Sequence, residues 1–207
     1  MQSLQGAQKM KNKQSVFLLH LLILSVVGIT LSGCVNLKPK TDPVKMYALG
    51  PVDSSASVSG QGPSIYVERP NMPAYLDGKR LQYRTASGEV EALKYARWAE
   101  PLEEGIARCI AEHLIQSSGQ HVAGFYPWPD RSKESLDLYV QFYKLGAFEN
   151  GEVRMAATWE LKLGSKTQRA GTFQAQGVTW ERDNAESLVT AINSSLAQLA
   201  EAVVGAN

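Results

Sequence analysis

The sequence predicts an α+β fold, in which a single antiparallel or mixed β-sheet packs against two main helices. Three observations predict it: short strand candidates come first, a helical stripe follows them, and three long strand candidates separated by tight turns precede a closing helix. Strands grouped before and after a helix, without regular alternation, are typical of α+β proteins. We expect both helices on one face of the sheet, with the other face partly free.

The early strand candidates are short. Residues 46–49 and 64–68 flank a Ser/Gly-rich segment that has the composition of a loop. Residues 81–85 and 90–95 are separated by Ala-Ser-Gly-Glu, which predicts a hairpin.

A helix is predicted over 101–116. Pro101 suits its first turn, where a missing N–H costs nothing, and two glutamates follow it at the end that the helix dipole makes favourable for acids. Its apolar stripe consists of Leu102, Ile106, Cys109, Ile110, His113 and Leu114. A short strand at 122–125 and a Tyr-Pro-Trp-Pro loop come next.

The second half predicts a three-stranded meander followed by a helix. Its strands are expected at 136–148, 152–163 and 168–179, and the Asn-Gly pair at 150–151 is a strong hairpin signal. Residues 183–186 resemble a capping box with Asp183 at the cap. The apolar face of the closing helix consists of Leu188, Ile192, Leu196, Leu199 and Val203.

The first 33 residues have the parts of an export signal. Three lysines and no acidic residue precede an apolar run at 16–31. The run is followed by a sequence that resembles a lipobox, Leu31-Ser32-Gly33-Cys34, at which a signal peptidase leaves a lipidated cysteine as the new N-terminus. The alternative is an uncleaved membrane anchor, for which the run is somewhat short. A cysteine at this place favours the lipoprotein.

This interpretation divides the chain into a signal peptide at 1–33, a lipidated tether at 34–45 and one domain at 46–207. Two or more acyl chains anchor a protein stably to a membrane. Position 35 is Val, whereas Asp directly after the cysteine resembles an inner-membrane retention signal. We therefore expect an outer-membrane lipoprotein with its domain in the periplasm. A tether of this length reaches at most about 35 Å.

Composition excludes one large class of function. Three of the 21 basic residues precede Cys34 and none of the 20 acidic residues does, which leaves 18 basic against 20 acidic residues in the mature chain. A nucleic-acid-binding protein would show a basic patch or stripe, so we expect no nucleic-acid partner. With Cys34 lipidated, Cys109 has no partner for an internal disulfide. We predict a buried, inert thiol at 109, the alternative being a reactive or intermolecular one.

The mature chain shows no catalytic constellation. Its two histidines, His113 and His121, have no zinc-ligand spacing with the one free cysteine. A G-x-S-x-G elbow and a phosphate-binding glycine-rich loop are both absent from the sequence. We therefore predict no enzyme, metal site or cofactor, and a hydrolase with an unrecognised site remains as an alternative.

Aromatic residues give the first interaction candidate. Tyr126 and Trp128 are either sheet and core aromatics or an exposed docking loop, since interfaces are enriched in Tyr and Trp.

Four stretches together carry a family resemblance. They are Tyr47-Ala48-Leu49-Gly50, Pro73-Ala74-Tyr75-Leu76-Asp77-Gly78, Leu81-Gln82-Tyr83-Arg84 and Ala96-Arg97-Trp98-Ala99-Glu100-Pro101-Leu102. Their order and spacing resemble the PqiC (YmbA-like) family of ABC-type transport auxiliary lipoproteins, over essentially the whole mature domain.

The resemblance implies a non-enzymatic periplasmic component. Such lipoproteins accompany MCE-domain systems that move phospholipid or other hydrophobic molecules between membranes, which implies an MCE-domain partner and, for some members, a homo-oligomeric ring. The resemblance implies that Trp98, Pro101 and Leu102 seat the first helix on the sheet. It also implies that the loop carrying Tyr75, Leu76 and Asp77 faces a partner or a neighbouring subunit, although a purely structural role explains these residues equally well. The competing hypothesis is a structural or assembly lipoprotein that binds other envelope proteins or cell wall.

Overall fold

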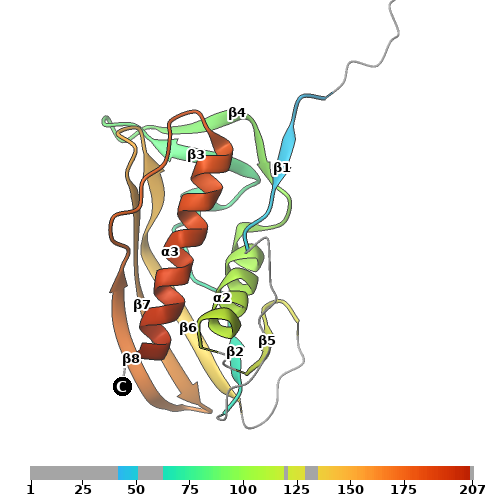
Figure 1. Ribbon diagram of the computed structural model, residues 1–207, viewed down its shortest axis with the longest axis vertical. Coiled ribbons are helices and arrows are strands. Elements are labelled where there is room, and N and C mark those ends of the chain that lie inside the picture. The colour runs from blue at the N-terminus through green and yellow to red at the C-terminus, as the bar shows by residue number, and fades with distance from the viewer. Residues whose placement is uncertain (1–41, 51–62, 119–120, 129–134, 206–207) are drawn as a thin grey trace, which may run out of the picture. The chain divides into compact units, whose positions relative to one another are not determined.

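One mixed β-sheet with two helices on it makes up the described part of the chain (Figure 1). The computed structural model describes residues 42–50, 63–118, 121–128 and 135–205. The predicted α+β class is confirmed. The elements are β1 (Lys45–Tyr47), β2 (Ile65–Val67), η1 (Ala74–Leu76), β3 (Arg80–Arg84), β4 (Val90–Trp98), α2 (Leu102–Ser118), β5 (Val122–Phe125), β6 (Leu136–Phe148), β7 (Val153–Leu163), β8 (Lys166–Gln174) and α3 (Ala185–Gly205). Cys34 and the residues Leu31, Ser32 and Gly33 lie outside the described residues.

The long strand β6 pairs along both of its edges. On one edge it forms the antiparallel meander with β7 and β8 that the sequence predicts. On the other edge it pairs in parallel with β2 near its start and with β3 near its end. The strand β5 extends the β2 arm, and β4 and then β1 extend the β3 arm. The sheet therefore divides into two arms on that side, which Figure 1 shows at the bottom and the top.

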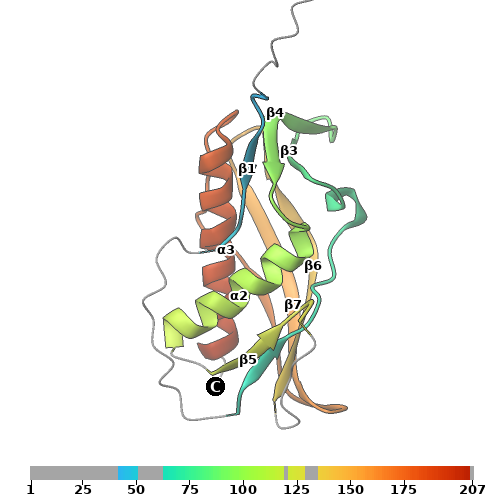
Figure 2. The ribbon, with the colours of Figure 1, turned by 90° about the vertical axis from the view of Figure 1, so that its right-hand side faces the viewer.

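Both helices cover the same face of the sheet, as expected (Figure 2). They pack against each other, with α2 over β2 and β5 and α3 over β7 and β8. All five apolar residues predicted for the face of α3 are buried. The length and hydropathy of α3 would suit a membrane span, but half of its apolar window is buried inside the domain, as in the core helix of a globular protein.

Two local expectations are wrong. The side-chain cap of α3 is Asn184, whose Oδ1 accepts the Ser187 N–H at 3.1 Å, so the cap lies one residue after Asp183. Asp183 instead has a φ of 63°, a turn conformation. The strand β8 ends at Gln174, five residues earlier than predicted, because Gly177, at a φ of 67°, interrupts the regular ladder. Beyond it Thr179 forms an isolated bridge with Glu152, just before β7.

Candidate functional site

Cys109 and His113, both on α2, have pKa values that burial shifts. Cys109 is fully buried, and burial raises the pKa of its thiol to about 12, as predicted for an inert cysteine. Burial also lowers the pKa of His113, while His121 is exposed. Among the residues that the structure describes, no group of three or more His, Cys, Asp or Glu side chains is placed to hold a metal ion.

The Trp98 corner joins the sheet to α2. Trp98 and Leu102 are buried in the core, and Pro101 is exposed immediately before the helix. The Pro101 carbonyl accepts the N–H groups of Glu104 and Gly105, both at 3.1 Å, and so begins the helical hydrogen bonding. The placement of these three residues is compatible with the seating role that the family resemblance implies.

A polar cluster around Arg108 holds the segment that follows β1. The Arg108 guanidinium donates to the Leu49 carbonyl at 2.6 Å and forms ion pairs with Glu100 and Glu112. Asn193 on α3 accepts the Gly50 N–H at 2.9 Å and donates to the Gly50 carbonyl at 3.3 Å. We call Arg108, Glu100, Glu112 and Asn193 the Arg108 cluster. Arg108 and Glu112 are four residues apart on α2, a spacing that the sequence displays. The bonds of Arg108 to Leu49 and of Asn193 to Gly50 depend instead on how α3 and the segment after β1 pack against α2.

The local geometry requires glycine at position 50. Its φ is 119°, and a Cβ there would lie 2.5 Å from Glu112 Oε2 and 2.8 Å from Arg108 Nη1. Only glycine adopts this conformation without strain, and only glycine leaves room for the two charged side chains. The Tyr-Ala-Leu-Gly stretch therefore ends in a site that both helices fix.

The three candidate residues in and after η1 lie in different surroundings. The Tyr75 ring is exposed, and its hydroxyl donates to the Leu145 carbonyl at 2.8 Å. Partial burial raises the pKa of this hydroxyl, and the nearby Arg84 offsets part of that shift. Leu76 is only 8% exposed and belongs to the core, so its side chain offers almost no surface to a partner. Asp77 is exposed at the exit of η1.

The Tyr126–Trp128 loop emerges beside the end of β2. Strands β2 and β5 run parallel with Val67 opposite Phe125, so the residues that follow each strand lie at the same end of the sheet arm. The Tyr126 N–H donates to the Val67 carbonyl at 2.8 Å, and the Tyr66 hydroxyl donates to the Trp128 carbonyl. These bonds fix the loop backbone, while the Trp128 side chain is 64% exposed.

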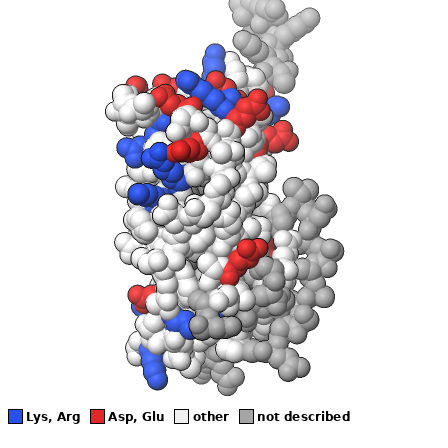
Figure 3. Space-filling model, turned by 60° about the vertical axis from the view of Figure 1, so that its left-hand side comes forward, with Lys and Arg blue, Asp and Glu red and all other residues white. Residues whose placement is uncertain are grey.

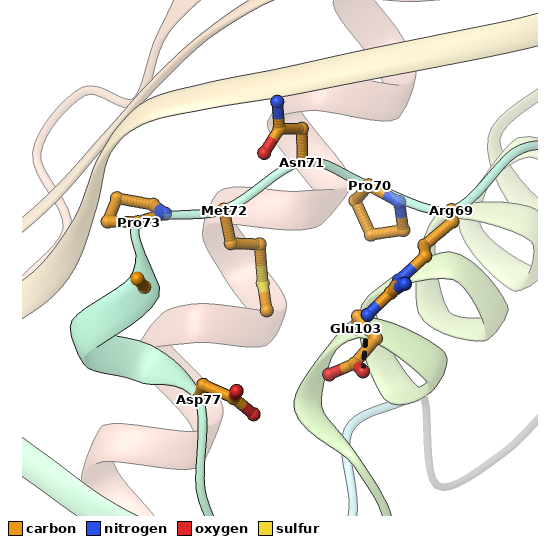
Figure 4. A pocket seen from close by; sticks show the side chains of 8 residues that line it. Arg69, Pro70, Asn71, Met72, Pro73, Asp77 and Glu103 are labelled. Carbon is orange, nitrogen blue, oxygen red and sulfur yellow. Dashed lines mark hydrogen bonds and ion pairs between the residues drawn. The ribbon is translucent and has the colours of Figure 1, made fainter.

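A hollow of about 420 Å³ lies next to this loop (Figure 4). The 69–77 segment arches over it, and Figure 4 shows Met72, Asp77 and Glu103 projecting toward it from two sides. Arg69 links the hollow to the loop, because its guanidinium lies 3.3 Å from Glu103 Oε1 and 5.5 Å from the centre of the Tyr126 ring. We call this patch the Arg69 surface, and its residues are Arg69, Met72, Asp77, Glu103, Tyr126 and Trp128.

The Arg69 surface thus brings together two segments that the sequence predicts as separate interaction candidates. It unites Asp77 with the Tyr126–Trp128 loop and leaves out Leu76, which is buried, and Tyr75, whose hydroxyl donates to the Leu145 carbonyl. Arg69 and Glu103 were not among the predicted residues. Pro70 and Pro73, which lie between Arg69 and η1, are the nearest local indication of an irregular segment there.

Comparison with known proteins decides the family. The family model described as "ABC-type transport auxiliary lipoprotein component" matches residues 47–204. This chain belongs to that family. The resemblance to the PqiC (YmbA-like) lipoproteins is thereby confirmed. A comparison with curated proteins gives no match.

Two solved structures share the fold of this transport auxiliary lipoprotein. The crystal structure of an uncharacterized protein has a TM-score of 0.60 at 18% identity, over 78% of this chain and 97% of that one. The crystal structure of protein XCC0632 from Xanthomonas campestris, assigned to the family model DUF330, has a TM-score of 0.57 at 17% identity, over 78% of this chain and 93% of that one. At these identities the likeness concerns the fold alone.

Membership of the family sets the general role. The chain is an auxiliary lipoprotein component of an ABC-type transport system, which indicates a membrane-anchored protein of the cell envelope. Both the Arg108 cluster and the Arg69 surface fall within the matched residues.

Proposed function

We propose that this lipoprotein is the non-enzymatic accessory subunit of an MCE-type ABC transport system at the outer membrane. Acyl chains on Cys34 anchor it, and its domain lies in the periplasm at the outer-membrane end of the MCE assembly. That assembly moves phospholipid or other hydrophobic molecules between the two membranes. The family match supports the transport role, and the lipobox resemblance together with Val35 supports the anchor and its membrane.

The Arg69 surface is the docking site for the MCE-domain protein. The observation that carries this proposal is the position of Arg69, which contacts both the Trp128 loop and the Glu103 wall of the hollow. An exposed tryptophan on a fixed backbone, two residues from a tyrosine whose ring lies beside an arginine at the rim of a hollow, has the composition of an interface hot spot. In a ring of identical subunits the surface would repeat, so that weak docking at each copy would add up through multivalency.

Site-specific photo-crosslinking in intact envelopes tests this role. A photoreactive amino acid replaces Trp128 in the lipidated protein, and in a matched control it replaces Tyr95, an exposed aromatic on β4. We expect the Trp128 position to crosslink to an MCE-domain protein, identified by mass spectrometry, and the Tyr95 position not to. Crosslinks from Trp128 only to cell wall or to other outer-membrane proteins would instead favour the structural lipoprotein.

A further inference from the structure

The second arm of the sheet carries a different hollow, of about 490 Å³, on the face that the helices leave free. Arg84, Lys144, Phe148 and Arg154 line it together with the turns at 85–88 and 149–150. On the side of the molecule shown in Figure 3, charged side chains gather toward the upper end, where the β6–β7 turn lies in Figure 1. Three of the four side chains named above are cationic.

Strand register places these side chains on one face. Arg84 is the cross-strand partner of Phe148, and Arg154 is the partner of Gly146. Cross-strand partners lie on the same face of a sheet, and so do residues two apart on one strand. Arg84 and Arg154 therefore lie on the same face as Lys144, Gly146 and Phe148. The intervening residues Leu145 and Ala147 are buried under the helices.

A β-bulge produces the outward position of Lys144. Phe142 pairs with Ala157 and Lys144 with Ala156, which leaves Tyr143 as the extra residue. Phe142 is buried on the helix side, so regular alternation would also turn Lys144 inward. The bulge shifts the alternation by one residue and turns the lysine outward, a use of bulges that is common beside binding sites.

The charges of the hollow are only partly neutralised. Arg154 pairs with Glu152, and the Glu149 carboxylate accepts the Ala86 N–H at 2.8 Å. Arg84 lies over the Tyr75 ring, 5.7 Å from its centre. Lys144 is exposed, and its ammonium group makes no ion pair or hydrogen bond with any described residue. The lining therefore presents net positive charge around the Phe148 ring, over which the Arg154 guanidinium lies at 4.3 Å.

We propose that this hollow binds a phosphate group, carried by a lipid headgroup or present as free phosphate. Arginine matches phosphate oxygens with paired N–H donors, and lysine adds a mobile point charge. Phe148 offers apolar surface to whatever carries the phosphate. The site lies on the opposite arm of the sheet from the Arg69 surface and needs no MCE-domain partner, so either proposal can fail without the other.

Binding of soluble probes to the lipidated protein in neutral detergent tests the site. The probes are dihexanoyl phosphatidylglycerol below its micelle concentration, inorganic phosphate, and dihexanoylglycerol, which has no phosphate. Titration calorimetry compares the natural protein with Lys144→Gln and with the control Lys166→Gln, which removes the same charge at the β7–β8 turn, roughly 24 Å away along β7. Melting temperatures of both variants should equal that of the natural protein, because both lysines are exposed.

We expect binding of the phosphate-bearing probes, at least tenfold weaker in Lys144→Gln and changed less than twofold in Lys166→Gln. Tighter binding of phosphatidylglycerol than of phosphate would assign the headgroup as the source, and equal binding would assign free phosphate. Absence of binding by both phosphate probes, equal loss in both variants, or equal binding of dihexanoylglycerol would overturn the proposal.

Discussion

Two arginines of this domain, Arg108 and Arg69, differ in burial and in the number of groups that they contact. Arg108 has a 26% exposed side chain held by two carboxylates and a backbone carbonyl, whereas Arg69 is 63% exposed and has one carboxylate and one ring beside it. The first joins the segment after β1 to α2. The second leaves most of its donors free at the rim of a hollow. Burial and the number of partners, and not residue type, separate a structural arginine from one available to a partner.

The largest effect on stability is expected for Arg108→Ala. The change leaves Glu100 and Glu112 facing each other without a cation and removes the donor to the Leu49 carbonyl, which should cost about 2–4 kcal/mol of unfolding free energy. Urea unfolding of the purified chain measures it. Arg108→Lys should recover only part of the loss, because one ammonium cannot reach all three acceptors. A loss below about 0.5 kcal/mol would show that the cluster is not structural.

Asn193→Ala should have the next largest effect. The change removes both hydrogen bonds to Gly50, so that the partly buried N–H and carbonyl of Gly50 lose their side-chain partner. The expected cost is about 1–2 kcal/mol of unfolding free energy. The neighbouring Ser194→Ala, whose hydroxyl only donates back to Thr190, serves as the control and should change stability by less than about 0.5 kcal/mol. Equal effects of the two changes on stability would show that the bonds from Asn193 to Gly50 do not stabilise the fold.

Burial of Cys109 makes the unfolding free energy depend on pH. The folded thiol has a pKa raised to about 12, mainly by burial, whereas the unfolded thiol ionises near 9. The unfolded state therefore loses its proton first, and this contribution to stability is complete below pH 9 and is lost as pH rises toward 12. The unfolding free energy of the natural protein should fall more steeply in that range than that of Cys109→Ala. Parallel curves, or labelling of the native thiol by a maleimide, would mean that the thiol is accessible.

Arg69→Ala should have the smallest effect on stability and the largest effect on docking. An exposed ion pair contributes up to about 1 kcal/mol, so the melting temperature should change little. Recovery of the MCE-domain protein in pull-downs should fall at least tenfold. Arg182→Ala, another exposed arginine with one carboxylate and one ring beside it, is the matched control and should leave recovery unchanged. Equal recovery with both variants would place the docking site elsewhere.

Local chemistry explains what the sequence predicts well. The meander follows from side-chain alternation and from Asn150-Gly151, where Gly151 has a φ of 86° and Asn150 Oδ1 accepts the Glu152 N–H. The two helices follow from apolar stripes that are buried in the structure. Each of these signals lies within a few consecutive residues, so the sequence displays it directly.

Non-local geometry explains what the sequence does not predict. The parallel pairing of β6 with β2 and β3 joins residues about seventy positions apart, for which no turn sets the register. The bonds from Arg108 to Leu49 and from Arg69 to Tyr126 depend on the same packing. Leu76 was misplaced for a related reason, since one turn of 3₁₀ helix turns it inward between two exposed neighbours.

The most direct measurement is quantitative co-purification of the MCE-domain protein with the lipidated chain from crosslinked envelopes. It compares the natural protein with Trp128→Ala and Tyr95→Ala, with the melting temperature of each recorded in parallel. The account predicts that the MCE-domain protein co-purifies with the natural protein and with Tyr95→Ala, and is lost with Trp128→Ala at an unchanged melting temperature. Recovery of cell-wall or other outer-membrane proteins in place of an MCE-domain protein, whichever variant is used, would contradict it.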